Sequence, residues 1–361
     1  MGWRWQRMER WHYLPASTTD PEDVERKEML TEPADSRKGI TLCQKALALL
    51  VVIGLLSLDI WERIAVPRDS QDGCETIAVR QEWRALNATE RNDFVRSVNC
   101  LSTIPSRWTH NGTVYDDFAQ LHGTIGRYCH HSASFLPWHR WTLHIWETAL
   151  RDHCGFRGHV PYWDWTRDWM DIASSSIWDP DTGIGGNGNP NGQRTVGNGS
   201  CVEDGPFTGL RPIKYNHTYE THCLSRGFAD KATLDQLLGK NFSPESIGRI
   251  MRSEEYETFN WAIEFLLHNN IHTAIGGDFW SMTAANDPLF FLHHAQLDHL
   301  WWQWQQHKPE ARLEAYSGRH MVNSTDQNAN LQDTLLFAGF VKDIPVSHAM
   351  NAGGKDLCYK Y

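Results

Sequence analysis

The chain has 361 residues, of which 40% are hydrophobic and 22% are charged, as in an ordinary globular protein. This composition excludes a wholly disordered or fibrous chain, and the formal net charge of -10 offers no basic surface for nucleic acid. The 18 tryptophans and 19 histidines are unusually many. Because histidine is the commonest transition-metal ligand, the spacing of the histidines is informative.

The N-terminal region divides into a polar segment and an apolar segment. Residues 1–45 carry mixed charges and several prolines without a helical period, so we expect a flexible cytoplasmic tail. Residues 46–61 include the uncharged stretch Ala46–Leu58, and more Lys and Arg precede this stretch than follow it. The pattern favours a single-pass membrane anchor, with the N-terminus in the cytoplasm and the body in the secretory-pathway lumen or outside the cell. A cleaved signal peptide and a buried globular helix are the alternatives.

Cysteines and glycosylation sequons are concentrated after the apolar segment. All six Asn-x-Ser/Thr sequons lie there, at Asn87, Asn111, Asn198, Asn216, Asn241 and Asn323. Seven of the eight cysteines also follow the segment, so at least one of these seven is free or bonded outside the chain. This distribution predicts a glycosylated body that contains disulfides and resides in an oxidising compartment.

The body of the chain, residues 70–361, is predicted to be one mainly helical domain with long loops. Asn87-Ala-Thr-Glu90 is a capping-box pattern, which predicts the start of a helix. Ser253–Ile275 is the longest uninterrupted helical candidate, and the alternation typical of strands is sparse. Residues 180–205 are rich in glycine and asparagine, which predicts a long surface loop.

One group of histidines has the spacing of a metal site on a helix. His268 and His272 stand at i and i+4, so on a helix their rings lie about one turn apart on one face and can share a metal ion. The zinc-protease motif with this spacing requires Glu after the first histidine, and Asn269 occupies that position.

A second group contains two adjacent histidines, of which normally only one can join the same metal. On a helix His293 and His294 point about 100° apart. Asp298 follows His294 by one turn and is suited to orient its ring. We therefore favour His294 as the ligand and expect His293 to be packed or hydrogen-bonded elsewhere.

His122, His130 and His139 form the remaining group. A single histidine among aromatic residues is more often part of the core than a ligand. Here two separate triplets emerge, each with one closely spaced pair and one outlying member. Six neutral imidazoles with no obligatory carboxylate or thiolate suit copper, which favours nitrogen ligands.

Four blocks of sequence carry a family pattern. They are HHSASFLPWHR (130–140), PYWDW (161–165), the 268–277 block that ends in paired glycines, and NDPLFFLHHAQLD (286–298). Together with the closing Tyr359 and Tyr361 they resemble the tyrosinase family of type-3 copper proteins, and most of all its short fungal tyrosinases and catechol oxidases. The resemblance implies an antiparallel four-helix bundle that holds two copper ions. It implies that copper A is bound by His122, His130 and His139, and copper B by His268, His272 and His294.

The same resemblance implies an oxidoreductase that uses O₂ to hydroxylate phenols at the ortho position, to oxidise o-diphenols to o-quinones, or both. The expected substrate is a small phenol, a secondary metabolite or a tyrosine-containing peptide. Family members use an asparagine at the position of Asn269 to help orient a water, and Glu264, one turn before His268, is a candidate to hold that water. Phe279 and Trp280 are candidates for the bulky group over copper A.

The sequence leaves two alternative functions open. The dicopper site of a haemocyanin-like relative would bind O₂ reversibly without turnover. A membrane-anchored scaffold would have a degenerate metal site, and the retention of all six histidines argues against it.

Overall fold

The computed structural model describes residues 73–109, 111–321 and 325–361. The expected tail at 1–45, the expected anchor at 46–61 and the sequon residue Asn323 lie outside the described residues. Within the described part of the chain, no helix combines the length and the apolar character needed to cross a membrane. The membrane anchor therefore stays a prediction.

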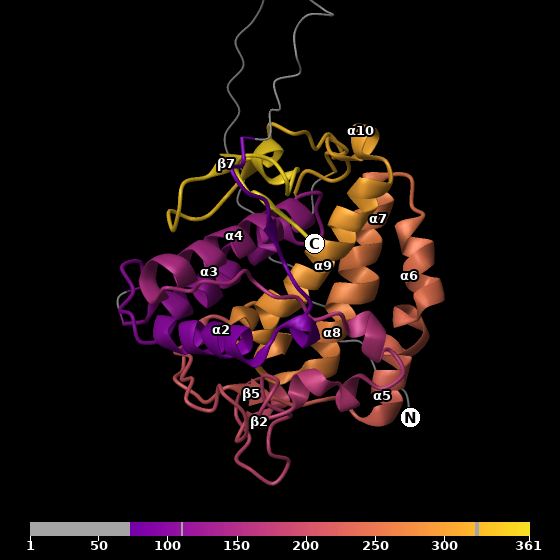
Figure 1. The fold of residues 1–361 in the computed structure, drawn as a ribbon. Coiled ribbons are helices and arrows are strands. Elements are labelled where there is room, and N and C mark those ends of the chain that lie inside the picture. The colour runs from indigo at the N-terminus through magenta and orange to yellow at the C-terminus, as the bar shows by residue number, and fades with distance from the viewer. Residues whose placement is uncertain (1–72, 110, 322–324) are drawn as a thin grey trace, which may run out of the picture. The chain divides into compact units, whose positions relative to one another are not determined.

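The described part of the chain is mainly helical, as the sequence predicts, and long loops connect its helices (Figure 1). The helices surround one large hydrophobic core, in which α4 packs against both α2 and α9. At the α4–α9 contact the rings of Trp146 and Phe291 stack with centroids 3.6 Å apart. The α-helices are α2 (Ala88–Leu101), α3 (Val114–Cys129), α4 (Phe135–Cys154), α5 (Lys231–Leu234), α6 (Pro244–Met251), α7 (Tyr256–Ala262), α8 (Asn269–Ile275), α9 (Leu289–His307) and α10 (Pro309–Arg312).

Side-chain caps explain where the first long helices begin. The predicted capping box is confirmed at α2, where Asn87 Oδ1 accepts the Glu90 N–H and Glu90 Oε2 accepts the Asn87 N–H. Thr113 and Asp116 form the same reciprocal pair at α3. Helix α4 ends at Gly155, whose φ of 63° lies in the left-handed region that glycine adopts without strain.

The helix predicted over Ser253–Ile275 begins at Tyr256 and is not regular throughout. Helix α7 continues into a π-helical turn, η8 (Ile263–His268), and then into α8. A π-helical turn has a wider hydrogen-bonding pattern than an α-helix, and such turns occur frequently at functional sites. Here His268, the first histidine of the C-terminal group, is the last residue of the irregular segment.

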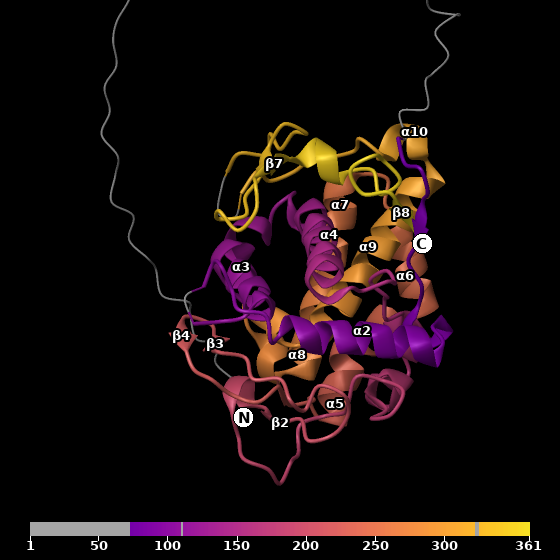
Figure 2. The ribbon, with the colours of Figure 1, turned by 60° about the vertical axis from the view of Figure 1, so that its left-hand side comes forward.

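The strands are short and occur in pairs. Strand β1 (Ala78–Val79) pairs in parallel with β8 (Tyr359–Lys360), so the first and last described segments run side by side (Figure 2). A disulfide between Cys74 and Cys358 closes the same junction. The antiparallel pairs are β2 (Ser200–Cys201) with β5 (Ser225–Arg226), β3 (Lys214–Tyr215) with β4 (Thr218–Tyr219), and β6 (Thr334–Leu335) with β7 (Ile344–Pro345).

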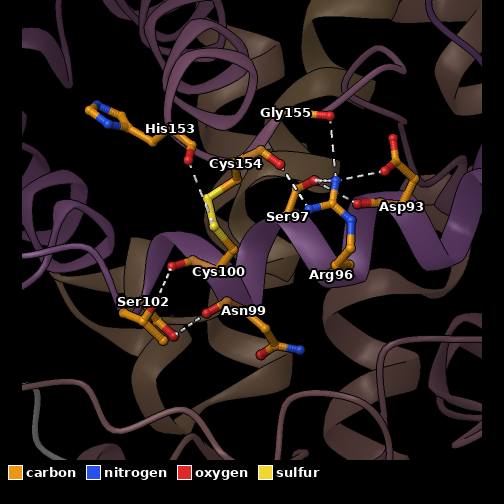
Figure 3. The surroundings of a disulfide bond; sticks show 10 residues. Asp93, Arg96, Ser97, Asn99, Cys100, Ser102, His153, Cys154 and Gly155 are labelled. Carbon is orange, nitrogen blue, oxygen red and sulfur yellow. Dashed lines mark hydrogen bonds and ion pairs between the residues drawn. A yellow bond between two sulfur atoms is a disulfide. The ribbon is translucent and has the colours of Figure 1, made fainter.

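Two further disulfides and one free thiol complete the set of described cysteines. Cys100 at the end of α2 bonds to Cys154 at the end of α4, and Arg96 donates to the Cys154 carbonyl beside this bond (Figure 3). Cys201 bonds to Cys223. Cys129 is free and buried, which agrees with the odd number of cysteines after residue 46. The sequence does not predict the pairing, but its odd cysteine count predicts at least one cysteine that is free or bonded outside the chain.

Candidate metal centre

Five helical elements bring the six predicted histidines together in two groups. The N-terminal group contains His122 on α3, His130 at the end of α3 and His139 on α4, and one ligand nitrogen of each lies within 4.8 Å of the others. In the C-terminal group, too, one ligand nitrogen of each histidine lies within 4.8 Å of the others. Its members are His268 on η8, His272 on α8, and His293 and His294 on α9. Five of the six predicted histidines are buried and His272 is half-buried.

Backbone and amide oxygens fix the protonation of five of these imidazoles. Each of the five has its Nδ1 within 2.9 Å of a carbonyl oxygen, and such an oxygen can only accept a hydrogen bond. The Nδ1 atom must then carry the proton, which leaves the Nε2 atom with a lone pair. The five pairs are His122 with Met282 O, His130 with Gly126 O, His139 with Phe135 O, His268 with Asn269 Oδ1 and His272 with Phe279 O.

The Nε2 atoms of His122, His139, His268, His272 and His294 lack a hydrogen-bond donor in the protein, as expected of metal ligands. The Nε2 atoms of His122 and His139 face each other at 3.4 Å, where two lone pairs repel unless a cation lies near both. The Nε2 atoms of His268, His272 and His294 are buried without a hydrogen-bond partner. Buried polar atoms without partners are costly. A metal ion held by each group removes this cost, so the residues present fit the copper ions that the sequence implies.

Burial keeps these imidazoles neutral at physiological pH. It lowers the pKa of His122 to about 4 and that of His130 to about 3, and it lowers the pKa of His272 to about 4. The pKa values of His139, His268 and His294 also lie well below the ordinary value, chiefly because of burial. Neutral imidazole is the form that binds a metal, and a purely nitrogen ligand set suits copper.

The two histidine groups lie against each other. The rings of His139 and His294 stack with centroids 4.1 Å apart and an interplanar angle of 5°. Two phenylalanines that no sequence pattern marks as functional also bridge the groups. Phe135 packs against His139 and His268 at 4.8 and 4.9 Å, and Phe290 packs against His122 and His294 at 4.9 and 4.2 Å. Phe135 lies in the 130–140 block and Phe290 in the 286–298 block. Membership of these blocks is the one sequence feature that points to a role for either residue at the centre.

His293 reaches the C-terminal group but has the wrong tautomer for a ligand. The indole N–H of Trp165 donates to His293 Nδ1 at 3.2 Å, and an indole can only donate. In the neutral ring Nε2 then carries the proton and has no lone pair for a metal. The structure thus supports the expectation that His293 is hydrogen-bonded elsewhere, and it identifies the partner.

The predicted role of Asp298 is wrong. Its carboxylate does not contact His294, because the Nδ1 of that histidine has no hydrogen-bond partner. Asp298 instead accepts from Arg140 Nε at 2.5 Å and from the hydroxyls of Tyr359 and Tyr361. A buried carboxylate gains more from a guanidinium than from a neutral imidazole, so tertiary partners override the neighbour one turn away.

One loop holds a histidine in each group. The Phe279 carbonyl accepts from His272 and the Met282 carbonyl accepts from His122, both at 2.6 Å. The turn that leads into this loop requires glycine at Gly277, since φ is 59° and a Cβ there would lie 2.1 Å from the Ser225 carbonyl oxygen. The paired glycines of the 268–277 block therefore allow the turn that brings the carbonyls of this loop to the histidines.

The two candidates for the bulky group over copper A lie in different environments. Phe279 is fully buried and stacks on His272, with ring centroids 4.3 Å apart, so it packs against the C-terminal group. Trp280 is 57% exposed. Met282 lies nearer the N-terminal group. Its Sδ atom would be 3.0 Å from a Cβ placed on Gly126, and the Gly126 carbonyl accepts a hydrogen bond from His130 of that group.

Asn269 and Glu264 each accept a hydrogen bond from a histidine at or next to the metal centre. Asn269 is half-buried and uses its Oδ1 to accept from His268 Nδ1 at 2.9 Å. Glu264 is only 1% exposed, and its Oε1 accepts the backbone N–H of His131 at 2.7 Å. Burial raises the pKa of Glu264 to about 8, although that hydrogen bond opposes the shift.

The helical fold and two adjacent all-histidine groups define a binuclear copper protein. Residues 112–307 match the family model described as the common central domain of tyrosinase. A tyrosinase-like protein of Diaporthe leptostromiformis is 58% identical over 80% of this chain and 74% of its own length. A tyrosinase of Aspergillus flavus is 56% identical over 80% of each chain.

The solved structure of a mutant polyphenol oxidase from Thermothelomyces thermophila matches with a TM-score of 0.68 and 26% identity. The match covers 87% of this chain and 95% of that one. The chain belongs to the tyrosinase family of type-3 copper proteins. It is a tyrosinase-type oxidase that uses two copper ions, which confirms the function and cofactor predicted from the sequence.

Proposed function

We propose that this oxidase hydroxylates monophenols at the ortho position and oxidises the resulting catechols to o-quinones. The observation that carries the proposal is the convergence of imidazole Nε2 lone pairs in two adjacent groups. Two copper ions, when bound, activate O₂ and accept electrons from the phenolic ring. His122, His130 and His139 would hold copper A, and His268, His272 and His294 would hold copper B. The helices that carry these residues form the four-helix bundle of the centre.

The protein supplies fixed geometry and a dry environment. Carbonyl partners on Nδ1 hold five of the imidazole rings in one tautomer, so ligation needs no change of proton position. Phe135 and Phe290 exclude water between the two groups. The half-buried His272 and Asn269 mark the side from which a phenol approaches.

Asn269 and Glu264 handle the phenolic proton in this proposal. Asn269 orients a water that takes the proton, and Glu264 holds that water. The support is that Asn269 contacts a ligand of copper B directly. The pKa of Glu264, raised by burial to about 8, is also close to physiological pH, which suits a group that exchanges protons.

The substrate is a phenol attached to a small metabolite or to a tyrosine-containing peptide. An oxidase of Emericella nidulans, 27% identical over 81% of this chain and 94% of its own length, is named for N-acetyl-6-hydroxytryptophan. A hydroxylated aromatic amino acid derivative is therefore a reasonable substrate class for the scaffold. The exposed Trp280 and Met282 beside the centre leave room for a substrate larger than a free phenol.

Oxygen uptake by the copper-loaded protein tests this function. Tyrosine, a short tyrosine peptide and a catechol are compared, with the metal-free protein and a His294→Ala variant as controls. We expect uptake with all three substrates and none in either control. Uptake with the catechol alone would remove the hydroxylase half of the proposal. A lack of turnover on any phenol, together with reversible O₂ binding, would favour the carrier function instead.

For its location we propose a glycosylated body in the secretory-pathway lumen or outside the cell, anchored through residues 46–61. The support is three disulfides in the described chain. The sequon residues Asn87, Asn111, Asn198 and Asn241 are exposed, and Asn216 is half-buried. Glycosidase treatment should shift the mobility of the protein from cells, and protease added to intact vesicles should remove only the tail. Full digestion of the body in intact vesicles would contradict this topology.

A further inference from the structure

His222, a buried histidine outside both metal groups, has an oxygen atom facing each of its ring nitrogens. It follows the hairpin of β3 and β4, and its side chain is 4% exposed. Its Nε2 lies 2.8 Å from Asp278 Oδ1, and its Nδ1 lies 2.6 Å from the Glu220 carbonyl oxygen. A carbonyl oxygen and an ionised carboxylate can only accept a hydrogen bond, so both ring nitrogens must carry a proton. The two contacts are therefore those of an imidazolium and not of a neutral ring.

Asp278, in η9 (Gly277–Trp280), is fully buried, and three N–H groups point at its carboxylate. Besides the His222 ring, the Asn286 side chain donates to its Oδ1 at 2.9 Å, and the Ser225 backbone donates to its Oδ2 at 2.9 Å. Hydrogen bonds from such donors favour the ionised form of a carboxyl group. A buried charge is tolerated when it is paired and hydrogen-bonded, and in the described part of the chain His222 is the ion-pair partner of this carboxylate.

The titratable groups around His222 either favour its protonated form or are neutral. Tyr215 of β3 packs edge-on against the imidazole with ring centroids 6.3 Å apart, and burial raises the pKa of this tyrosine, so it adds no charge. Burial by itself lowers the pKa of His222. The hydrogen bond and charge of Asp278, together with Glu220, outweigh burial and raise the pKa of His222 above its ordinary value. His222 therefore keeps its proton to a higher pH than a free histidine does.

Asp278 lies at the start of the loop that holds a histidine in each metal group. It directly precedes Phe279, whose carbonyl accepts from His272 at 2.6 Å, and the same loop carries the carbonyl that accepts from His122. These two hydrogen bonds keep the proton on Nδ1 and the lone pair on Nε2, which is the atom available to a metal ion. A displacement of Asp278 would therefore move the acceptor of one proposed ligand in each group.

Two uncharged hydrogen bonds also join the hairpin to this part of the chain. The Asn216 N–H donates to Thr283 Oγ1 at 3.1 Å, and Asn286 Nδ2 donates to the Lys214 carbonyl at 2.7 Å. Neither bond depends on the charge of His222. Loss of the proton from His222 should therefore loosen the loop without detaching it.

We propose that the His222 imidazolium is a positioning residue for the copper centre: its ion pair with Asp278 fixes the loop that holds one histidine in each group, and loss of its proton weakens copper binding. The sign of the effect follows from the direction of the shift. The ion pair contributes fully below about pH 6.5, the ordinary histidine value, and is lost as the pH rises through the raised pKa of His222. This inference rests on the ligands assigned in the proposed function, because it describes the control of the same site.

NMR of the metal-free full chain, labelled with nitrogen-15 in its histidine rings, tests the charge of His222 without copper. The resonances of this ring are those that the His222→Gln variant lacks. We expect the ring to lose a proton with a midpoint above about pH 6.5, and to carry a proton on both nitrogens below that midpoint. His217→Gln, the same change at an exposed position on the turn of the hairpin, should keep these resonances. A midpoint at or below the ordinary histidine value would overturn the proposal.

The copper affinity of the full chain, measured by competition with a copper(I) chelator below and above this midpoint, tests the link to the centre. The proposed ligands stay neutral throughout, because burial holds their pKa values below the ordinary value, so they add no pH dependence of their own. We expect the wild-type affinity to fall as the pH rises through the midpoint. His222→Gln and Asp278→Asn should bind copper about tenfold more weakly below the midpoint and show no such fall. His217→Gln should behave as the wild type does.

The loss of pH dependence separates positioning from general damage to the fold, which would lower the affinity at every pH and leave its pH dependence in place. If Asp278→Asn does not fold, the wild type and His222→Gln decide the question. A wild-type affinity that does not change through the midpoint, or an unchanged pH dependence in His222→Gln, refutes the positioning role and leaves the oxidase function intact. A wild-type chain that binds no copper refutes the proposed function, and the positioning role falls with it.

Discussion

Arg140 donates its Nε–H to Asp298 Oδ1 across 2.5 Å, and this ion pair joins α4 to α9 next to both histidine groups. Arg140 directly follows His139, and Asp298 lies one turn after His294. Burial by itself raises the pKa of Asp298, but Arg140, Arg80 and two tyrosine hydroxyls outweigh burial and hold the pKa below its usual value. The pair therefore ties α4 to α9, the two helices that carry the stacked rings of His139 and His294.

Removing the carboxylate of Asp298 should destabilise the fold strongly. Asp298→Ala leaves the fully buried Arg140 without its charge partner, and we expect a loss of about 3–5 kcal/mol in the free energy of unfolding. Denaturant unfolding measures this loss. Asp152→Ala, an exposed change on the same helix as Arg140, serves as the control and should cost less than about 0.5 kcal/mol. Similar midpoints for the two variants would contradict the assigned role.

The neighbours His293 and His294 should differ in their effect on copper binding. His294→Gln removes a proposed copper B ligand, so the bound copper should fall from two ions to about one per chain. His293→Gln keeps an oxygen that can accept the Trp165 indole N–H, so two ions should remain bound. Metal analysis after dialysis distinguishes the variants. Loss of copper from the His293 variant alone would reverse the ligand assignment.

The metal-free protein should lose stability as the pH falls below about 6.5. Burial depresses the pKa of His122 to about 4 and that of His130 to about 3 in the folded protein. In the unfolded chain the histidine pKa is near 6.5. Between the depressed pKa of the folded protein and about 6.5, the unfolded chain therefore binds more protons than the folded protein, so a fall in pH favours unfolding. Each imidazole should contribute about 1.4 kcal/mol per pH unit.

Urea unfolding of the metal-free protein at several pH values checks this slope. His130→Asn removes one of the titrating groups and should give a shallower dependence on pH. An unchanged slope in that variant would show that His130 does not resist protonation in the folded state.

The disulfide between Cys100 and Cys154 should stabilise the protein without affecting the chemistry. It closes a loop of 54 residues between the ends of α2 and α4. A Cys100→Ser, Cys154→Ser double variant should lose about 4 kcal/mol through the added freedom of the unfolded chain. Copper content at 25 °C should stay the same, because neither cysteine belongs to the histidine groups. Copper loss matching that of His294→Gln would contradict this separation.

The sequence was informative where a short-range pattern or a characteristic residue type carries the structure. The capping box at Asn87 and Glu90 involves residues three apart, so the printed order contains the whole interaction. The spacing of His268 and His272 likewise predicts one helix face, although the π-helical turn before them was not expected. The odd number of cysteines after residue 46 predicted at least one cysteine that is free or bonded outside the chain, without saying that it would be Cys129.

By itself, the sequence determined the mainly helical class, the family and the six histidines that the fold brings together, because residue identity and short spacing encode these features. The tertiary structure alone decided which partners those residues have. Every residue carries a backbone carbonyl, so nothing in the order of residues marks Met282 or Phe279 as the acceptor for a histidine. Asp298 pairs with Arg140 rather than with His294 because folding brings a buried guanidinium from another helix to the carboxylate, and charge attraction in a dry interior exceeds the effect of proximity along the chain.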